Sequence, residues 1–524
     1  MSPLTDSYSV PGSYDVVPYQ GRIVRNASPD HLAMAALWSA GLRVCSRRVR
    51  VVELGCGDGR NLLALAFYDP GSGFVGIDRS EVELDRARRG AQRVGLANVD
   101  FVLEDLRRID PARYAPCDFV IAHGLYSWVP DDARDAIMTF CRDSLTPMGL
   151  AYVSYNAQPG WATRRIVREI LLGTHAVREA TLEDKAGVAS AAAGRLLEQL
   201  PSGGYAWSVL LAEELQRVRD GESSYVLHEY LAETNDGFWL RDFVDHAQRH
   251  GLDYVADAQF CRMEGHVPFG LSAATTPERA GQVEREQIVD LLGHRYFHSS
   301  ILCRAGARDR VVPTTPDLCA GYLATALRAV ADPFVLTDGA AERFAGIGGV
   351  EIVLDAAITK AAVVTLAVQW PRGQQLEALY HEAALLLSKH QCPIGADARH
   401  RLTNELTRLF EIGQIDLRMA EPPPTSVLDE YPEAHALARY EAEHRTAVTT
   451  PYHTELALEP DLLALVRSLD GSRSRTTLKR AFGAASVDRA LPLLSRWGLL
   501  ACRRQPSSAS VRRPGGPVSH DRST

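Results

Sequence analysis

The sequence has no long apolar run, no paired-cysteine motif and no metal-ligand spacing, and each absence excludes a class of protein. No stretch approaches the roughly 18 apolar residues of a membrane span, and the first 30 residues are polar and contain Pro and Ser, unlike a signal peptide. The nine cysteines include no C-x-x-C pair, which argues against a disulfide framework and a zinc site. The histidines show no ligand spacing with cysteine or carboxylate, so no metal is expected. These features predict a cytoplasmic protein.

The chain also lacks the positive charge that nucleic-acid binding usually requires. Its net charge is -8, so a polyanion would be repelled unless basic residues were locally concentrated. The hydrophobic content of 46% and the charged content of 23% are typical of folded soluble protein. A length of 524 residues, at about 150 residues per domain, predicts about three or four domains.

What the chain does have is a glycine-rich loop between an apolar run and a helical pattern, in the stretch Arg50–Arg60 (RVVELGCGDGR). The apolar residues predict a strand, and the sequence Asn61-Leu-Leu-Ala-Leu-Ala that follows predicts a helix. Gly55, Gly57 and Gly59 let the backbone turn sharply, and they place no Cβ between the loop and a ligand at the helix N-terminus. This stretch therefore predicts a ligand-binding loop.

The spacing of the glycines narrows the ligand class. A dinucleotide fingerprint reads G-x-G-x-x-G, and a Walker loop needs Gly-Lys-Ser/Thr, whereas this loop reads G-x-G-x-G with Glu53 two places before the first glycine. The pattern resembles motif I of class I S-adenosylmethionine (SAM)-dependent methyltransferases. In that family the loop faces the amino-acid part of SAM, and the next strand supplies an acid that binds the ribose. Asp78, at the end of Gly73–Asp78, stands where the resemblance requires this acid.

The βα alternation continues beyond the loop and predicts a doubly wound, Rossmann-like α/β sheet. Ser28-Pro29-Asp30 begins a first helix that ends near Gly41. The further elements are helix 81–94, strand 99–103, strand 118–122, helix 131–145 and strand 149–155. Ligands of such sheets lie at the carboxyl ends of the strands, which here carry Glu53 to Gly59, Asp78, Glu104-Asp105, His123-Gly124 and Asn156.

The resemblance implies roles for several of these polar residues. Asp105 stands where the family's acid accepts from the adenine amino group, although it could instead cap the helix that begins at Leu106. His123 is interpreted as stacking against adenine rather than as a general base. Tyr14 and Tyr19 are either a lid over the cofactor or packing against the first helix. The candidate cofactor-binding residues are Tyr19, Glu53, Gly55, Cys56 (read as a small filler), Gly57, Gly59, Asp78, Arg79, Asp105, Leu106 and His123.

Aromatic residues after the strand ends are candidates for an acceptor site. A lysine acceptor must be neutral, which costs roughly 4 to 5 kcal/mol at pH 7 unless burial lowers its pKa. An apolar, aromatic channel would provide this burial, with an amide or backbone carbonyl to orient the amine; plain core packing is the alternative for each aromatic residue. His228 and Glu229 either link to the site or are structural. The candidate catalytic residues are Tyr126, Trp128, Tyr155, Asn156 and Trp161.

The last strands of the sheet are expected late in the chain. Residues 156–224 read as helices rich in Ala, Leu, Glu and Arg, so we expect a helical insertion that contributes to substrate binding or dimerisation. Tyr225–Leu231 is predicted as the next strand, followed by a helix over 238–250 and a strand over 252–256.

Several motifs narrow the resemblance: His123–Val129, Ser154–Trp161, His228–Asn235, Asp290–Phe297 and Leu302–Arg304. They are similar to bacterial methyltransferases that carry a methyltransferase regulatory domain, a group that includes rickettsial-type protein lysine methyltransferases acting on outer-membrane proteins. The resemblance covers roughly residues 14–305 and implies a multi-domain enzyme, expected to be a dimer, without defining the acceptor.

The βα pattern stops after Gly306, and winged-helix-like units are expected instead. The first has helices over 318–331, 358–370, 374–388 and 398–413 and a short strand over 350–354; the second has helices over 459–469, 474–482 and 486–498 and a strand over 499–503. Helix 398–413 carries three Arg against two Glu, so protein contact is favoured over DNA contact.

The predicted organisation is a disordered N-terminus (1–13), a SAM-binding methyltransferase domain (14–155), the helical insertion (156–224), a regulatory region that completes the sheet (225–305), two winged-helix-like units (306–424 and 425–504) and a disordered tail (505–524). The predicted function is SAM-dependent methyl transfer to a protein or peptide, at lysine. Two alternatives remain: an O- or N-methyltransferase of a small metabolite or peptide natural product, and a SAM-binding regulator whose winged helices contact DNA.

Overall fold

The computed structural model describes residues 21–201, 205–259, 281–308, 318–346, 349–419 and 428–501. Its centre is one large sheet of order β3-β2-β1-β4-β5-β8-β7, with the short β6 paired to the end of β5. The strands are β1 Arg50–Leu54, β2 Gly73–Asp78, β3 Val99–Leu103, β4 Cys117–Ala122, β5 Leu145–Ala157, β6 Gly237–Phe238, β7 Leu252–Asp257 and β8 Phe297–Arg304. The predictions for residues 1–13 and 505–524 lie outside the described residues.

The five predicted strands are present and run parallel, which confirms the doubly wound α/β fold. Helices α2 (Pro29–Ala40), α3 (Arg60–Tyr68), α4 (Glu81–Val94) and α5 (Asp131–Ser144) alternate with these strands as expected. Successive strand residues enter opposite cores: Val51 and Tyr152 pack with α2 and α3, whereas Val52 and Val153 pack with α5 and α11 (Leu240–Arg249). Because both faces of the sheet are covered, the strands are almost continuously apolar.

The end of the sheet differs from the prediction at one segment. Residues 225–231 were expected to be the sixth strand, but they belong to helix α10 (Ser223–Tyr230), whose Val226, Leu227 and Tyr230 are buried in the core of the helical insertion. The outer strand is β7, and β8 runs antiparallel between β5 and β7. A short apolar segment is compatible with the residue period of a strand and with that of a helix. Its burial against other helices therefore decides its structure.

A buried charge network holds β8 in place. The His298 ring lies between two carboxylates, with Nδ1 2.8 Å from Asp257 Oδ2 and Nε2 2.7 Å from Asp290 Oδ2. Arg295 donates to both acids, at 2.6 Å and 3.4 Å. Burial and Arg295 lower the pKa of His298, but the hydrogen bonds to the two acids outweigh them and raise it. The network therefore pairs two cations with two anions inside the regulatory region.

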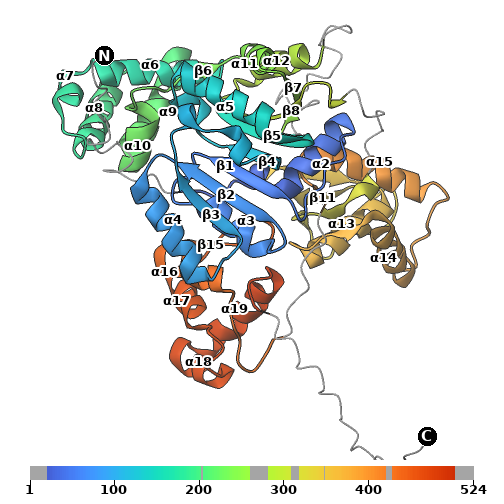
Figure 1. The fold of residues 1–524 in the computed structure, drawn as a ribbon. Helices are drawn as coiled ribbons and strands as arrows, with labels where there is room; N and C mark the ends of the chain where they lie inside the picture. The colour runs from blue at the N-terminus through green and yellow to red at the C-terminus, as the bar shows by residue number, and fades with distance from the viewer. Residues whose placement is uncertain are drawn as a thin grey trace, which may run out of the picture.

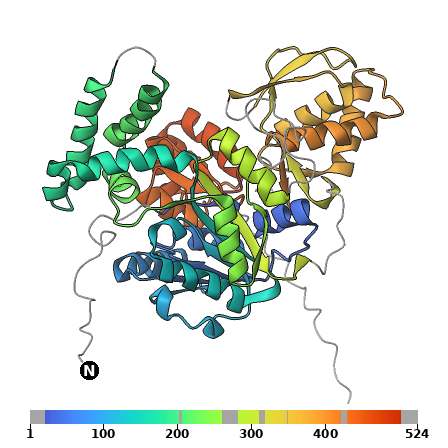
Figure 2. The same ribbon diagram turned by 90° about the horizontal axis from the view of Figure 1, so that it is seen from above.

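The helical insertion follows β5 directly and forms its own core. It comprises α6 (Gly160–Gly173), α7 (His175–Glu179), α8 (Lys185–Gln199), α9 (Ala206–Asp220) and α10. Figures 1 and 2 show it as an arm that projects from the sheet on the side of α4, away from α13–α15. Its position after the carboxyl end of β5 places it next to the expected binding edge of the sheet.

Residues 318–419 form a unit that packs against the α2 side of the sheet domain (Figure 1). Its helices α13 (Ala357–Gln369), α14 (Leu376–Lys389) and α15 (Ala398–Glu411) agree with the prediction, as does the strand β12 (Glu351–Leu354). The helix predicted over 318–331 is wrong: the segment contains β9 (Tyr322–Ala324) and β10 (Arg328–Ala329). Although the segment is rich in Ala and Leu, β9 pairs with β13 (Gln374–Gln375) and β14 (Asp416–Arg418), so sheet pairing overrides helix propensity.

Residues 428–501 form a second, smaller unit under α3 and α4 (Figure 1). The predicted helices appear as α17 (Pro460–Ser468), α18 (Arg475–Phe482) and α19 (Ala484–Arg496). The sequence reading missed α16 (Ala436–His444) and the hairpin of β15 (Ala447–Thr449) and β16 (Glu455–Ala457). Among the helices of the described residues, none combines the length and apolarity that a membrane crossing needs.

Candidate active site

The loop after β1 contains three glycines with positive φ, and each one has a different neighbourhood. A Cβ on Gly59 would lie 2.7 Å from Ala87 and from the Phe101 ring, so this glycine permits helix packing. A Cβ on Gly55 would lie 3.1 Å from Leu125, in the loop after β4. A Cβ on Gly57 would meet no atom within 4 Å. Gly57 is therefore the glycine whose backbone is open to a ligand.

Asp78 ends β2 beside this open backbone. Its Oδ2 accepts a hydrogen bond of 2.8 Å from the Gly57 N–H, and its Oδ1 accepts one of 2.9 Å from the Ser80 N–H. The half-buried carboxylate has further lone pairs, so it can accept hydrogen bonds from a ligand diol while it holds the loop. The geometry supports the predicted ribose-binding position. Arg79, beside it, is exposed.

Glu53 lies behind the loop and is buried. Asn61, at the start of α3, donates to both carboxylate oxygens at 3.2 Å and 3.3 Å. Burial raises the pKa of Glu53 to about 8, opposed by the Asn61 hydrogen bond. Burial therefore favours the protonated form of Glu53. The sequence reading missed Asn61, although a polar residue inside an otherwise apolar helix start was a signal.

The residues after β3 have a local role. Asp105 caps the short helix at Leu106–Arg108: its carboxylate accepts from the Arg107 backbone N–H at 3.0 Å and from the Arg107 guanidinium at 2.6 Å. The hydrogen bond from Arg107 lowers the pKa of Asp105. Leu106 is half-buried and packs against the core on the α5 side. The capping role of Asp105 is therefore present, and an adenine contact remains a prediction.

Cys56 is a filler, as the sequence suggested. A Cβ on Gly76 would lie 2.7 Å from its Sγ, so the thiol occupies the space over β2 that this glycine leaves open. Burial raises the pKa of the Cys56 thiol, which makes it unreactive. Tyr14 and Tyr19 lie outside the described residues.

His123 follows β4 and is tied to the sheet. Its Nδ1 lies 3.1 Å from the Tyr152 hydroxyl and 3.0 Å from Ser154 Oγ, and its ring stacks on Tyr152. Burial, and secondarily Arg22, lower the pKa of His123 to about 4. The imidazole is therefore neutral at pH 7 and too weak a base to take a proton from an ammonium group. Stacking on adenine remains a prediction.

Asn156 is the catalytic candidate that lies at a polar junction. Its backbone N–H donates to Ser127 Oγ at 2.8 Å, and its Nδ2 donates to Asn235 Oδ1 at 2.7 Å. Asn235 in turn donates to the Glu229 carbonyl at 2.8 Å. The sequence motif His228–Asn235 predicts no role for Asn235; β6, which follows it, brings it to the end of β5. Two asparagines therefore meet at the binding edge of the sheet.

The aromatic candidates lie in two places, beside the Asn156–Asn235 contact and in the core. Trp128 is half-buried and its Nε1 donates to the His228 carbonyl at 3.2 Å, which places it next to the Asn235 segment. Tyr126 and Tyr155 are buried in the core around Phe243, and Tyr155 stacks on that ring with centroids 4.2 Å apart. The structure thus assigns Tyr155 to packing, because its side chain enters the core between β5 and α11 and not the binding edge.

Trp161 lies at the start of α6 and is fully buried. A Cβ on Gly237 would lie 2.3 Å from its ring, so β6 crosses directly over the indole. Its Nε1 is buried and has no hydrogen-bond partner among the described residues. Arg164 stacks near the ring, 5.4 Å from its centroid, and pairs with Glu229 at 3.4 Å. Burial raises the pKa of Glu229.

One group in the described part of the chain has converging ligand atoms of the kind that hold a metal. Asp135, His246 and His250 have these atoms within 4.8 Å of one another. The two histidines are four residues apart, His246 on α11 and His250 at its C-cap. Both Nε2 atoms face Asp135 Oδ1, and the Nδ1 atoms face hydroxyls of Tyr126 and Thr139. Each ring nitrogen of the two histidines therefore has a hydrogen-bond partner.

Three family models match separate parts of the chain. A methyltransferase domain matches residues 51–149, a predicted methyltransferase regulatory domain matches residues 222–304, and a PKMT C-terminal winged helix domain matches residues 430–496. The first match contains the loop after β1, Asp78, Asp105 and His123, and the second contains Asn235. The cofactor side of the candidate site and Asn235 therefore lie within matched domains, whereas Asn156 and Trp161 lie between the two matches.

The chain is also similar to individual proteins. It is 30% identical over 299 residues to an uncharacterised protein of Rickettsia prowazekii, an alignment that covers 55% of this chain and 52% of the relative, so the chain spans about half of that relative's length. A trans-aconitate 2-methyltransferase of Azoarcus is 31% identical over 119 residues, or 23% of this chain and 44% of that protein. The structure of PKMT2 from Rickettsia typhi shares the fold, with a TM-score of 0.80 and 23% identity over 92% of this chain and 100% of the other. The same protein is also known in complex with AdoHcy, with a TM-score of 0.78 and the same identity and coverage.

Proposed function

We propose that this chain, which carries a methyltransferase domain, a methyltransferase regulatory domain and a PKMT-type winged-helix domain, transfers a methyl group from SAM to a lysine amine of a protein. The observation that carries the proposal is the Asp78 carboxylate bound to the Gly57 N–H, at a glycine whose Cβ side is open. The relatives add support, since the PKMT2 of Rickettsia typhi binds AdoHcy in the same fold.

The residues at the binding edge suit a cationic ligand with a diol. Asp78 would accept from the ribose hydroxyls, and the loop backbone would face the amino-acid end, with Glu53 buried behind it. When bound, SAM supplies a methyl group that its sulfonium has already activated. The chain then has to hold the acceptor in line, keep water out and bind a neutral amine.

The Asn156–Asn235 pair is the group that we expect to orient the acceptor. The hydrogen bond from Asn156 Nδ2 to Asn235 fixes the orientation of the amide, and its oxygen would accept a hydrogen bond from an amine and direct the nitrogen lone pair towards the methyl group. No basic side chain is needed if the surroundings lower the amine pKa by burial. The half-buried Trp128 beside this pair contributes such surroundings.

The size of the structure around the site supports a macromolecular acceptor. The insertion α6–α10 follows the carboxyl end of β5, and residues 318–419 add a further unit. A small metabolite would need only the sheet domain. The alternatives remain a methyltransferase of a small metabolite or peptide, and a regulator that contacts DNA.

Incubation with methyl-labelled SAM and a cell lysate tests the proposal. We expect label in the protein fraction, on lysine after peptide mapping, and no label with the Asp78→Ala variant. Label confined to the small-molecule fraction would support the metabolite alternative and overturn the lysine proposal. An absence of label in both fractions, together with duplex DNA binding that weakens steeply with salt, would support the regulator.

A further inference from the structure

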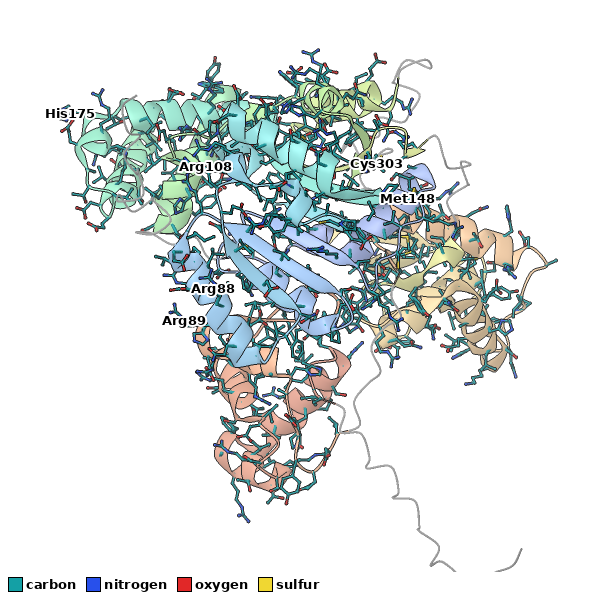
Figure 3. All side chains as sticks on the ribbon, in the orientation of Figure 1. Arg88, Arg89, Arg108, Met148, His175 and Cys303 are labelled. Carbon is teal, nitrogen blue, oxygen red and sulfur yellow. The ribbon has the colours of Figure 1, made fainter. Side chains whose placement is uncertain are left out.

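The C-terminal unit of residues 428–501 contacts the catalytic domain at the helices that follow the glycine loop. Helix α16 lies beside α4, whose Arg88 and Arg89 are labelled in Figure 3, and the hairpin β15–β16 reaches α3. Tyr68, at the end of α3, donates to the Thr449 carbonyl at 2.8 Å. The unit is therefore packed against the cofactor side of the molecule rather than held at a distance.

The first contact reaches the glycine loop itself. Asp58 lies between Gly57 and Gly59, and its Oδ2 accepts a hydrogen bond of 2.6 Å from the Arg445 guanidinium. Its Oδ1 accepts from the Arg60 backbone N–H at 3.2 Å. The side chains of Asp58 and Arg445 are only 14% and 20% exposed, so solvent screens this ion pair weakly.

The second contact reaches Glu53, the acid of the loop motif, through the side-chain amide of Asn61. His453 Nε2 lies 2.7 Å from Asn61 Oδ1, which also accepts from the Val24 N–H at 3.1 Å. The Nδ2 of the same amide donates to Glu53. Burial lowers the pKa of His453 to about 3, so the ring is neutral at pH 7 and its Nε2 carries the proton that it donates. A residue 392 positions away thus fixes the amide that holds Glu53.

The third contact surrounds the first residue of α3. Arg60 lies 2.5 Å from Glu455 and 3.5 Å from Glu441 of the C-terminal unit, and it donates to the Gly21 carbonyl at 3.1 Å. Glu441 is buried, and Thr449 donates to it through its backbone N–H and hydroxyl. The N-terminus of the helix that follows the loop is therefore held by groups of the C-terminal unit.

We propose that the C-terminal winged-helix unit is an internal support of the SAM loop and that Arg445 and His453 are positioning residues for SAM binding. The surface that carries them is occupied by this chain's own catalytic domain, so it is not free to contact nucleic acid. The inference rests on the proposed SAM site. Two glycines with positive φ flank Asp58, and a loop of this kind loses conformational entropy when a ligand orders it. Prior anchoring of Asp58 and Asn61 reduces that cost.

Calorimetric titration of the full-length protein with S-adenosylhomocysteine tests the inference without requiring turnover. Arg445→Gln and His453→Leu should each weaken binding about tenfold, the size of a coupling through a contact network. Arg445→Lys should recover part of the affinity, because it keeps the charge. The matched control is Arg93→Gln: Arg93 pairs with Glu443 at 2.9 Å in the same interface, but it is 64% exposed and lies on α4 rather than in the loop, so binding should stay within about twofold of wild type.

The kinetics give a second readout. The two variants should raise the KM for SAM and leave kcat at saturating SAM close to wild type, since neither residue touches the acceptor. Thermal melting of each variant shows whether it is folded at the temperature of the titration. If Arg445→Gln is unfolded at that temperature, the affinity of Arg445→Lys is compared with that of wild type instead. Folded variants that bind as tightly as wild type would overturn the inference. Failure of the wild-type protein itself to bind S-adenosylhomocysteine would instead overturn the proposed function.

Discussion

The Asp78 carboxylate accepts a hydrogen bond of 2.8 Å from the Gly57 N–H, which joins the end of β2 to the glycine loop after β1. The same carboxylate also accepts from Ser80 at the start of α4. One acid thus links two crossover connections of the sheet at the place where the cofactor is expected. Its removal should affect cofactor binding more than stability.

For Asp78→Ala, we expect SAM affinity to fall by about 1.5 to 3 kcal/mol, the range for a hydrogen bond to a charged group. Calorimetry measures the change. Asp85→Ala is a suitable control, because Asp85 lies on α4 with a side chain that is 51% exposed. Unchanged SAM affinity in Asp78→Ala would show that Asp78 does not bind the ribose.

Glu53 should make the stability of the ligand-free protein depend on pH. Burial raises its pKa from the ordinary value of 4.5 to about 8 in the folded state, so the folded state holds the proton more tightly. The contribution to stability is therefore fully present below about pH 4.5 and is lost as the pH rises towards 8. Glu53→Gln cannot titrate at this position. The melting temperature of the variant, relative to that of wild type, should therefore increase as the pH rises from 5 to 9. A constant difference across this range, with exposed Glu81→Gln as a control, would contradict the assignment.

Asn235→Ala should lower turnover without weakening SAM binding. The substitution removes the acceptor that holds Asn156 Nδ2 at 2.7 Å, so the Asn156 amide can turn away from the acceptor amine. A misplaced orienting group costs up to about a hundredfold in rate. Steady-state rates at saturating labelled SAM measure the effect. Asn404→Ala, on α15 beside His400, is the control, and equal rates in both variants would remove Asn235 from the site.

His298→Gln should destabilise the protein by about 3 to 5 kcal/mol, the range for breaking a buried ion pair. The variant leaves Asp257 and Asp290 with Arg295 as their remaining cation in the network. Because the pKa of His298 is raised on folding, its contribution to stability is fully present below the ordinary histidine pKa of 6.5 and is lost as the pH rises through the folded pKa. Urea unfolding at several pH values should show the deficit of the variant shrinking at high pH. The exposed His175→Gln should show no deficit.

The first five strands and the helices between them could be predicted because their sequence patterns involve residues that are close together in the chain. The strands β1 to β5 and the helices between them have apolar patterns long enough to distinguish a strand from a helix, and β3 and α4 begin and end at the predicted residues. The predictions for 225–231 and 318–331 are wrong because neighbours in space decide the structure of both segments: the first is short and packs among helices, and the second pairs with strands far along the chain. The same limit applies to β8, whose antiparallel pairing with β5 depends on strands far away in the chain.

The sequence by itself determined the glycine loop, the acids Glu53 and Asp78 and the first five strands, because each depends on residues that are close together in the chain. Tertiary structure alone decided that Asn235 meets Asn156, that Tyr155 enters the core, and that Arg445 and His453 reach the glycine loop. These contacts join residues tens to hundreds of positions apart. Their partners are chosen by the packing of whole domains, and no local pattern of residues records that choice.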